Sequence, residues 1–104
     1  MRIAYFYLMR DEQDRVHAVA PDHAAYWRDL RVPGYVGGPL ADRSGGLITF
    51  EAESMQVAEE LVANDPFVRA DLHERAWVKE WDLAATEPVA PDLRPVGRAR
   101  RPMT

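Results

Sequence analysis

The chain has 104 residues, of which 47% are hydrophobic and 29% are charged, so we expect one domain with a single core. It contains no cysteine, which excludes disulfides, thiolate nucleophiles and cysteine-ligated metals. The net charge of −4 argues against a nucleic-acid-binding protein, which would carry a basic surface. The sequence has no apolar run near the roughly 20 residues of a membrane span and no secretory signal pattern. We therefore expect a cytoplasmic protein that binds neither nucleic acid nor a membrane.

The composition changes near residue 84. Residues 84–104 hold four of the eight prolines, and their four arginines against two acidic residues give a charge of 4 − 2 = +2. This segment shows no hydrophobic periodicity, which is typical of a flexible extension or of one draped on a partner subunit. The folded domain is therefore predicted to span residues 1–83.

The first third of the chain predicts a strand followed by a helix. Residues 3–8 are aromatic and aliphatic enough for a strand, and the polar residues 11–15 indicate a loop. Pro21 suits the first turn of a helix over residues 21–30. The 3.6-residue period places four side chains on one face of that helix: His23, Tyr26, Trp27 and Leu30.

Two further strands are predicted before the second helix. Residues 35–40 fit a strand at the edge of a sheet, because Pro39 cannot donate a ladder hydrogen bond. Residues 47–51 alternate in the manner of a half-buried strand.

The last elements are a helix, a short helical turn and a strand. Ser54 is a suitable N-cap for a helix over residues 55–63. Asp65 can cap a second, short turn that has Pro66 in its first position. Residues 75–83 alternate between large and small side chains and predict the final strand.

The element order β-α-β-β-α-β predicts an α+β, ferredoxin-like fold, a four-stranded antiparallel sheet with two helices on one face. The opposite face must carry large side chains, because both sides of the first strand are apolar and Trp77 and Trp81 share one side of the last. We expect a second copy to cover this face in a sheet-to-sheet homodimer. The alternative is that the proline-rich tail covers it.

Among the three histidines, His23 is the candidate for chemistry. It lies on the apolar face at the first turn of the predicted helix, where the helix N-terminus disfavours a protonated ring. A neutral imidazole would suit a general base, although a core histidine bonded to a backbone carbonyl fits the same spacing. His17, in a polar loop, and His73, before the last strand, are expected to be solvated surface residues.

Asp65 also has two interpretations. It can serve only as an N-cap, or its carboxylate can orient the ring of His23 and stabilise the charged form. No serine or threonine is marked as a nucleophile, so an acid/base pair is more economical than covalent catalysis. Four aromatic residues also have two interpretations, since they can line a ligand pocket or simply form part of the hydrophobic core: Tyr5, Tyr7, Trp27 and Phe67.

The glycine-rich segment 37–39 permits close backbone approach, but it matches no phosphate-binding or dinucleotide-binding motif. The scattered carboxylates and histidines form no recognisable metal cage. We therefore expect neither a cofactor nor a metal.

Several short motifs together resemble the YCII-related family of small dimeric α+β barrel proteins over roughly residues 3–82. They are Pro-Asp-His-Ala at 21–24, Gly-Gly-Pro-Leu at 37–40, Gly-Leu-Ile-Thr-Phe at 46–50 and Ala-Asn-Asp-Pro-Phe at 63–67, and Tyr5 fits the first strand. The resemblance implies that His23 and Asp65 form a catalytic dyad. Relatives often carry an arginine where this chain has Ala20, which puts any anion contact at that position in doubt.

One branch of this family resembles lyases that remove chloride from hydroxylated aromatic rings, and neighbouring barrel families include lactone isomerases and cofactor-free monooxygenases. The resemblance therefore implies an acid/base enzyme without a cofactor that eliminates, isomerises or cyclises a small phenolic or enolic molecule. His23 would move the proton, Asp65 would fix its tautomer, and the backbone near Gly38 would donate to an oxyanion. The expected substrate contacts are Tyr5, Tyr7, Trp27, Gly38 and Phe67. The alternatives are a non-catalytic metabolite-binding or accessory dimer and a cofactor-free monooxygenase.

Overall fold

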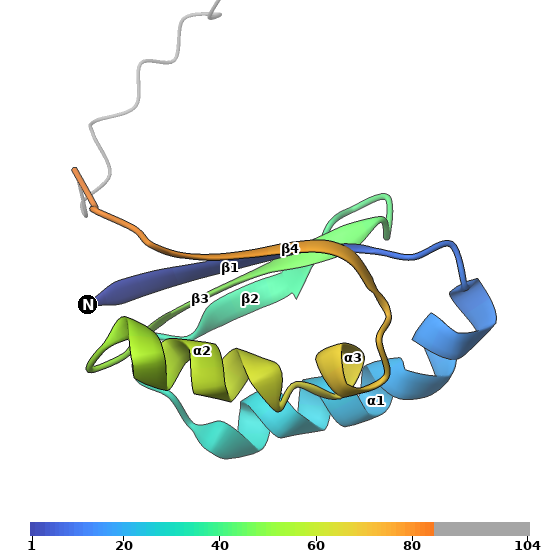
Figure 1. Ribbon diagram of the computed structural model, residues 1–104, viewed down its shortest axis with the longest axis horizontal. Coiled ribbons are helices and arrows are strands. Elements are labelled where there is room, and N and C mark those ends of the chain that lie inside the picture. The colour runs from blue at the N-terminus through green and yellow to red at the C-terminus, as the bar shows by residue number, and fades with distance from the viewer. Residues whose placement is uncertain (85–104) are drawn as a thin grey trace, which may run out of the picture.

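Seven elements follow one another in a computed structural model that describes residues 1–84 (Figure 1). They are β1 (Arg2–Met9), α1 (Gln13–Leu30), β2 (Val36–Pro39), β3 (Gly45–Glu51), α2 (Met55–Ala63), α3 (Pro66–Arg69) and β4 (His73–Glu80). With α3 as a short turn after α2, this order confirms the predicted α+β, ferredoxin-like fold. The predicted tail lies, apart from Ala84, outside the described residues.

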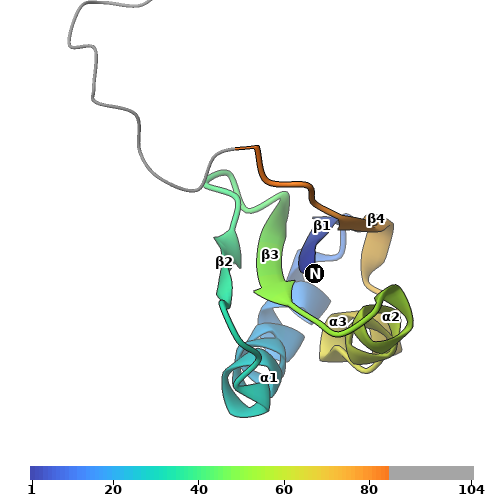
Figure 2. The same cartoon turned by 90° about the vertical axis from the view of Figure 1, so that its left-hand side faces the viewer.

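The four strands form one antiparallel sheet in the order β2-β3-β1-β4. All helices cover the same face of this sheet, and the opposite face carries no element among residues 1–84 (Figures 1 and 2). Figure 2 shows α1 below the β2 side of the sheet and α2 with α3 below the β1 and β4 side. The sheet therefore has one helix-covered face and one open face.

The core lies between the sheet and the helices. Alternate side chains of β1 point toward the helices and are buried, among them Ile3 and Tyr5. Cross-strand register places Ile3 opposite Phe50 and Tyr5 opposite Ile48 on β3, so the four side chains form one apolar surface. Trp27 of α1 closes it from the helical side with only 1% of its surface exposed.

Helix α1 begins at Gln13 and not at Pro21, so the prediction of a loop over residues 11–15 was wrong. Pro21 lies inside the helix, where it has no amide to donate to the carbonyl of His17, four residues earlier. Both residues are exposed, so water can satisfy that carbonyl at low cost. The inward face of the added turns carries the partly buried Val16 and Ala20, and their burial stabilises the longer helix.

The second helical region follows the predicted caps. The Ser54 hydroxyl accepts a hydrogen bond from the amide of Val57 at 3.1 Å and begins α2. Asp65 caps α3 through the amide of Phe67 at 2.8 Å, with Pro66 in the first helical position. This local geometry fixes the backbone of Asp65 at the point where α1, α3 and the sheet meet.

Strands β3 and β4 each begin two residues earlier than predicted, and β4 ends at Glu80. A β-carbon on Gly45 would collide with the backbone carbonyl of Tyr7, so this glycine allows β3 to pass close to β1. A β-carbon on Gly46 would collide with the Tyr7 hydroxyl, so this glycine leaves room for the Tyr7 side chain. In β4 a register shift opposite Leu8 and Met9 brings His73 into the ladder.

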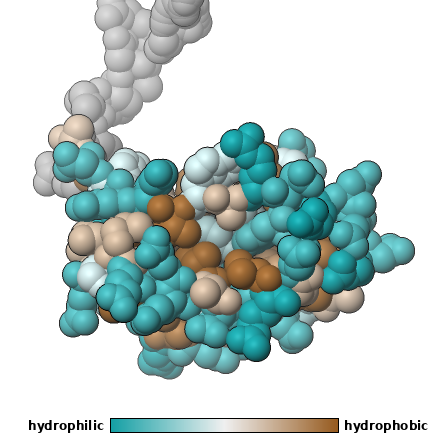
Figure 3. Space-filling view, viewed as in Figure 1, coloured by the Kyte–Doolittle hydropathy of each residue, from teal (hydrophilic) through white to brown (hydrophobic). Residues whose placement is uncertain are grey.

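The open face of the sheet is apolar at its centre. Phe6 of β1 and Trp77 of β4 stack there with ring centroids 5.3 Å apart, and Leu47 and Val36 are 40% and 69% exposed. Figure 3 has the same view as Figure 1, with the open face at the upper edge, and shows a mostly hydrophilic side on which a few hydrophobic residues appear. None of the helices within residues 1–84 is both long enough and apolar enough to cross a membrane.

Candidate active site

The carboxylate of Asp65 is the centre of a buried polar cluster. It has no exposed surface and accepts hydrogen bonds from His23 Nδ1 at 2.8 Å, Trp27 Nε1 at 3.0 Å and the Tyr5 hydroxyl at 3.0 Å. The cap bond from the Phe67 amide is the fourth. These donors come from β1, α1 and α3, so the fold itself positions the carboxylate.

This environment keeps Asp65 ionised. Burial by itself would raise the pKa of the carboxyl, but the hydrogen bond and charge of His23, followed by the Trp27 and Phe67 donors, hold the pKa below its ordinary value. An ionised carboxylate has only acceptor sites, which matches four donors directed at it.

His23 lies in the middle of α1 with its ring stacked on Phe67, the two centroids 4.2 Å apart. Nδ1 donates to the ionised Asp65, so the other ring nitrogen, Nε2, is the one directed at the cavity, and it is the nitrogen that can take up a proton. The helix begins at Gln13, ten residues earlier, so the expected effect of the helix N-terminus on His23 is absent, since that field fades within one turn. The tautomer is set by Asp65 instead.

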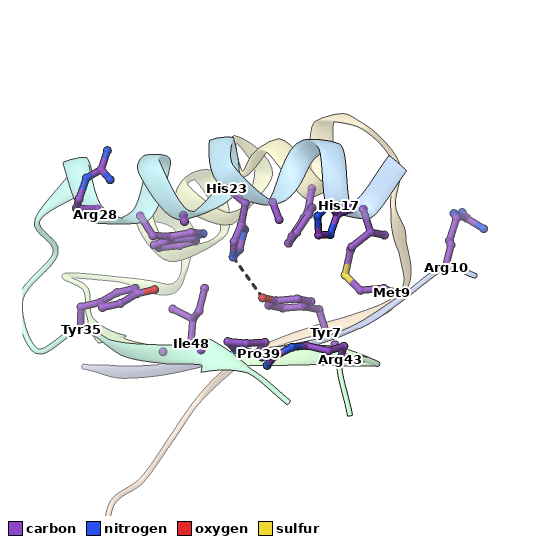
Figure 4. Close-up of a pocket in the computed structure, with 18 of the residues that line it drawn as sticks. Tyr7, Met9, Arg10, His17, His23, Arg28, Tyr35, Pro39, Arg43 and Ile48 are labelled. Carbon is purple, nitrogen blue, oxygen red and sulfur yellow. Dashed lines mark hydrogen bonds between the residues drawn. The ribbon is translucent and has the colours of Figure 1, made fainter. Parts of the chain in front are cut away.

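The hydroxyl of Tyr7 reaches the free nitrogen of His23. It lies 3.3 Å from His23 Nε2, and the close-up shows this contact at the centre of the cavity wall (Figure 4). Burial, followed by the charge of Asp65, raises the pKa of Tyr7, so the hydroxyl keeps its proton at neutral pH and acts as a donor. The Tyr7 hydroxyl thus lies next to the basic nitrogen.

His73 is not the solvated surface residue that we expected. Its Nε2 lies 3.1 Å from the Tyr5 hydroxyl, and its ring stacks on Tyr7 at a centroid distance of 4.9 Å. Burial, and secondarily the charge of His23, lowers its pKa, although Asp65 opposes this. Since the Tyr5 hydroxyl donates to Asp65, its oxygen accepts from His73 Nε2–H, and the polar cluster extends from α1 to β4.

A cavity of about 920 Å³ adjoins this cluster, between α1 and the strands β2 and β3. Four of the five expected contact residues line it: Tyr7, Trp27, Gly38 and Phe67. Tyr5 does not; it is fully buried beneath the wall, where it supports Asp65. His23 is on the wall with 13% of its side chain exposed. His17, expected in a loop, is in α1 and lines the same cavity.

The amide of Gly38 does not face the cavity. Leu40 donates its amide to the Gly45 carbonyl at 2.8 Å, and in an antiparallel ladder alternate residues direct their amides toward the neighbouring strand. Gly38, two residues earlier in β2, therefore directs its amide to β3. Gly38 pairs with Leu47, whose side chain lies on the open face, so a β-carbon on Gly38 would point away from the cavity, where it meets no atom within 4 Å. The glycine of β2 on the cavity side is Gly37, opposite Ile48.

Taken together, these groups have the chemistry of proton transfer. The imidazole of His23 faces the cavity, a buried carboxylate can stabilise its protonated form, and a phenolic hydroxyl lies beside the nitrogen that can take the proton. Within residues 1–84 no three histidine or acidic side chains are grouped closely enough to hold a metal ion.

The chain matches one protein-family model and is similar to known solved structures. The model of a family described as "YCII-related domain" matches residues 1–82. The solved structure of 5-chloro-2-hydroxyhydroquinone dehydrochlorinase (TftG) from Burkholderia phenoliruptrix AC1100, in complex with 2,5-dihydroxybenzoquinone, is similar at 27% identity with a TM-score of 0.70. The alignment covers 79% of this chain and 94% of that one.

A second solved structure, Rv0793 from Mycobacterium tuberculosis, is similar in fold alone, with 15% identity and a TM-score of 0.50. That alignment covers 81% of this chain and 97% of Rv0793. No curated protein matches this chain at a significant level.

Proposed function

The chain belongs to the YCII-related domain family, and from this premise we propose that it is a cofactor-free acid/base enzyme whose base is His23 and whose substrate is a small phenolic or enolic ring. The contact between His23 Nδ1 and Asp65 at 2.8 Å, with Nε2 left facing a cavity, carries the proposal. The 27% identical neighbour that is named a dehydrochlorinase supports elimination as the first reaction class to test, ahead of isomerisation and cyclisation.

In the proposed step, Nε2 of His23 takes a proton from a ring hydroxyl or an acidic ring carbon. The electron pair of the broken O–H bond forms a carbonyl bond, or that of a broken C–H bond forms a ring double bond, and in an elimination the leaving group departs with the electron pair of its bond to the ring carbon. Asp65 stabilises the imidazolium by charge. The Tyr7 hydroxyl, freed from Nε2, donates to the ring oxygen where negative charge develops. This assigns to Tyr7 the role that we had expected of the Gly38 backbone.

The test compares His23→Gln with His17→Gln, since both histidines line the cavity but only His23 contacts Asp65. Purified variants are assayed with chlorinated and unchlorinated hydroxyhydroquinones, with chloride release and ring absorbance as readouts. Loss of a general base lowers kcat by roughly 100- to 10,000-fold. We expect that loss in His23→Gln and near wild-type turnover in His17→Gln. A His23→Gln variant that retains near wild-type turnover would refute the role of His23.

A non-catalytic metabolite-binding dimer is the second candidate. The observation that favours it is that the four donors account for the buried charge of Asp65 without any catalytic role. NMR titration of His23 with and without Asp65→Asn separates the two. The binding protein would be favoured if the His23 signals shift on addition of ligand, if the titration of His23 is the same with and without Asp65→Asn, and if the protein turns over none of the hydroxyhydroquinones. Oxygen consumption in the same assays tests the monooxygenase alternative.

We also propose that the protein is a homodimer formed through the open face of the sheet. The stacked pair Phe6 and Trp77 and the exposed Leu47 and Val36 support this, because an apolar sheet face is stabilised when a second copy covers it. A two-fold axis through this face would join the two sheets and leave the helices of each copy on the outside.

A further inference from the structure

We infer that the ligand of the cavity is a ring that carries a carboxylate, and that Arg43 holds this carboxylate while Arg31 adds to the positive field. This inference rests on the proposed function, since it concerns the same cavity, but it assigns a substrate class that the His23–Asp65 pair does not. The inference does not come from the similar dehydrochlorinase, because the 2,5-dihydroxybenzoquinone bound there has no carboxyl group.

The charge of the cavity wall is the first observation. Four arginines line the cavity, Arg10, Arg28, Arg31 and Arg43, and no aspartate or glutamate of the described residues lines it. The chain as a whole carries a net charge of −4. The charged residues of the cavity wall are therefore positive although the chain as a whole is negative, and such a wall attracts anions.

The partners of these arginines are the second observation. Arg10 and Arg28 are engaged by surface carboxylates at 3.3 Å and 3.1 Å. Arg31 and Arg43 form no ion pair with any residue from 1 to 84. The guanidinium of Arg43 makes one long contact, 3.5 Å from Nη1 to the Leu40 carbonyl. Its remaining donors bind no residue from 1 to 84 and can therefore bind a ligand.

The backbone at the two unpaired arginines is the third observation. Arg31, which ends α1, has φ 52°, and Arg43, in the turn between β2 and β3, has φ 67°. Glycine and asparagine are favoured in this left-handed region, and a longer side chain there reduces stability. The third non-glycine residue with positive φ, Asp71, is the partner of Arg10. Strained backbone positions cluster at functional sites, so the presence of two such arginines in the wall of one cavity indicates a role in binding.

The position of Arg43 relative to His23 sets the geometry of the ligand. In the close-up, Arg43 lies beside Tyr7 and Pro39 on the sheet side of the cavity, and His23 reaches in from the helical side (Figure 4). Tyr7 lies between the two residues in this view, so a ligand that contacts both has to extend past Tyr7, with its reacting atom at His23 Nε2 and its charged substituent at Arg43. Arg31 lies eight residues beyond His23, about 12 Å along the helix, toward the far end of the cavity.

The experiment compares two probes that differ only in charge, 4-hydroxyphenylacetate and 4-hydroxyphenylacetamide, in NMR titrations of the full chain. We expect the wild type to bind the carboxylate about tenfold more tightly than the amide, because charge-assisted hydrogen bonds are strong but this site is partly open to water. Arg43→Gly should abolish the preference, and Arg31→Gly should reduce it. Arg69→Gln removes the same charge outside the cavity and should leave it unchanged.

The same glycine variants test the backbone argument. Because glycine adopts positive φ without a steric cost, Arg43→Gly and Arg31→Gly should melt at or above the wild-type temperature. A loss of affinity then cannot be attributed to unfolding. Melting well below the wild type would show that the side chains are kept for stability and would overturn the argument.

Equal affinity of the wild type for the two probes, or no detectable binding of the carboxylate at its solubility limit, would also overturn the inference. Failure of the proposed function is distinguishable. His23→Gln is expected to retain the preference for the carboxylate while it loses turnover. A wild type that turns over neutral rings but prefers no anion would retain the role of His23 and refute that of Arg43.

Discussion

At the scale of single residues, the site is one directed chain of hydrogen bonds. His73 donates to Tyr5, Tyr5 donates to Asp65, His23 donates to the same carboxylate, and Tyr7 donates to His23. Every member has one consistent proton position, because the ionised Asp65 can only accept. The orientation of His23 therefore depends on residues that never contact a ligand.

Tyr5→Phe tests this dependence. The variant keeps the buried ring but removes the donor to Asp65, so we expect a loss of about 1 kcal/mol in stability. We also expect a 10- to 100-fold fall in kcat, roughly the effect of removing groups that orient metal-ligating imidazoles. Chemical denaturation and steady-state kinetics measure the two. Tyr26→Phe is the matched control, since its hydroxyl donates to the Leu61 carbonyl at 2.6 Å and not to Asp65. A similar kcat in both variants would contradict the positioning role.

His73 predicts a pH dependence of stability. Groups from every neighbouring element face it, Tyr5 and Tyr7 from β1, Asp65 from the start of α3 and His23 from α1. Its folded pKa lies below the ordinary 6.5, so between these two values the unfolded chain binds a proton that the folded chain does not.

The stability contributed by a neutral His73 is therefore complete above pH 6.5 and is lost as the pH falls from there toward the folded pKa. The slope is at most about 1.4 kcal/mol per pH unit for one proton. His73→Gln should flatten the dependence of the unfolding free energy on pH in this window. Parallel curves for wild type and variant would show that His73 does not titrate with folding.

The sequence could predict His23 and Asp65 because both stand in short motifs that resemble a family. It could not predict the role of His73. The helix-facing residues of β4, Ala76 and Val78, have even numbers, and strict alternation would place His73 on the open face. The register shift next to Met9 changes that parity, and such an irregularity leaves no sign in the residue types.

At the scale of elements, α1 shows how a proline can mislead. Pro21 in a first turn is a common arrangement, and it predicts a helix that begins there. In the structure the helical periodicity extends back to Gln13, and the whole length of α1 borders the cavity. His17 thereby becomes part of the cavity wall, which a helix over residues 21–30 could not include.

Pro21→Ala should therefore stabilise the protein. Proline in a helix interior costs about 3 kcal/mol, of which the restricted unfolded chain returns up to about 1 kcal/mol. We expect a gain of about 1–2 kcal/mol in urea denaturation, with unchanged turnover. A variant that is less stable than the wild type would indicate that the exposed ring of Pro21 packs against something other than α1, such as a second subunit.

At the scale of the whole molecule, the element order predicted the architecture because strong turn or cap residues separate most of the elements, although α1 begins without a side-chain cap. Pro33 and Gly34 follow α1, and Ser54 precedes α2. What covers the open face could not be predicted in the same way. A partner copy and the tail both contain apolar residues, and single-chain periodicity does not distinguish between them.

Trp77→Lys tests the proposed dimer. A charge introduced beside Phe6 at the centre of the open face would be buried without a partner in a sheet-to-sheet dimer, so light scattering should show the mass of one chain. Glu59→Lys on the exposed side of α2 is the control and should retain the dimer. A wild type that is monomeric, or a Trp77→Lys variant that remains dimeric, would contradict the proposed interface.

The outer strand β2 has a consequence for how copies of this protein meet. It is only four residues long, every residue is exposed, and it ends at Pro39, which has no amide hydrogen. Growth of the sheet by lateral addition of strands from other molecules is therefore blocked on that side. We expect any strand pairing between copies during refolding from urea to use the opposite edge strand, β4, which is eight residues long and contains no proline, and not β2.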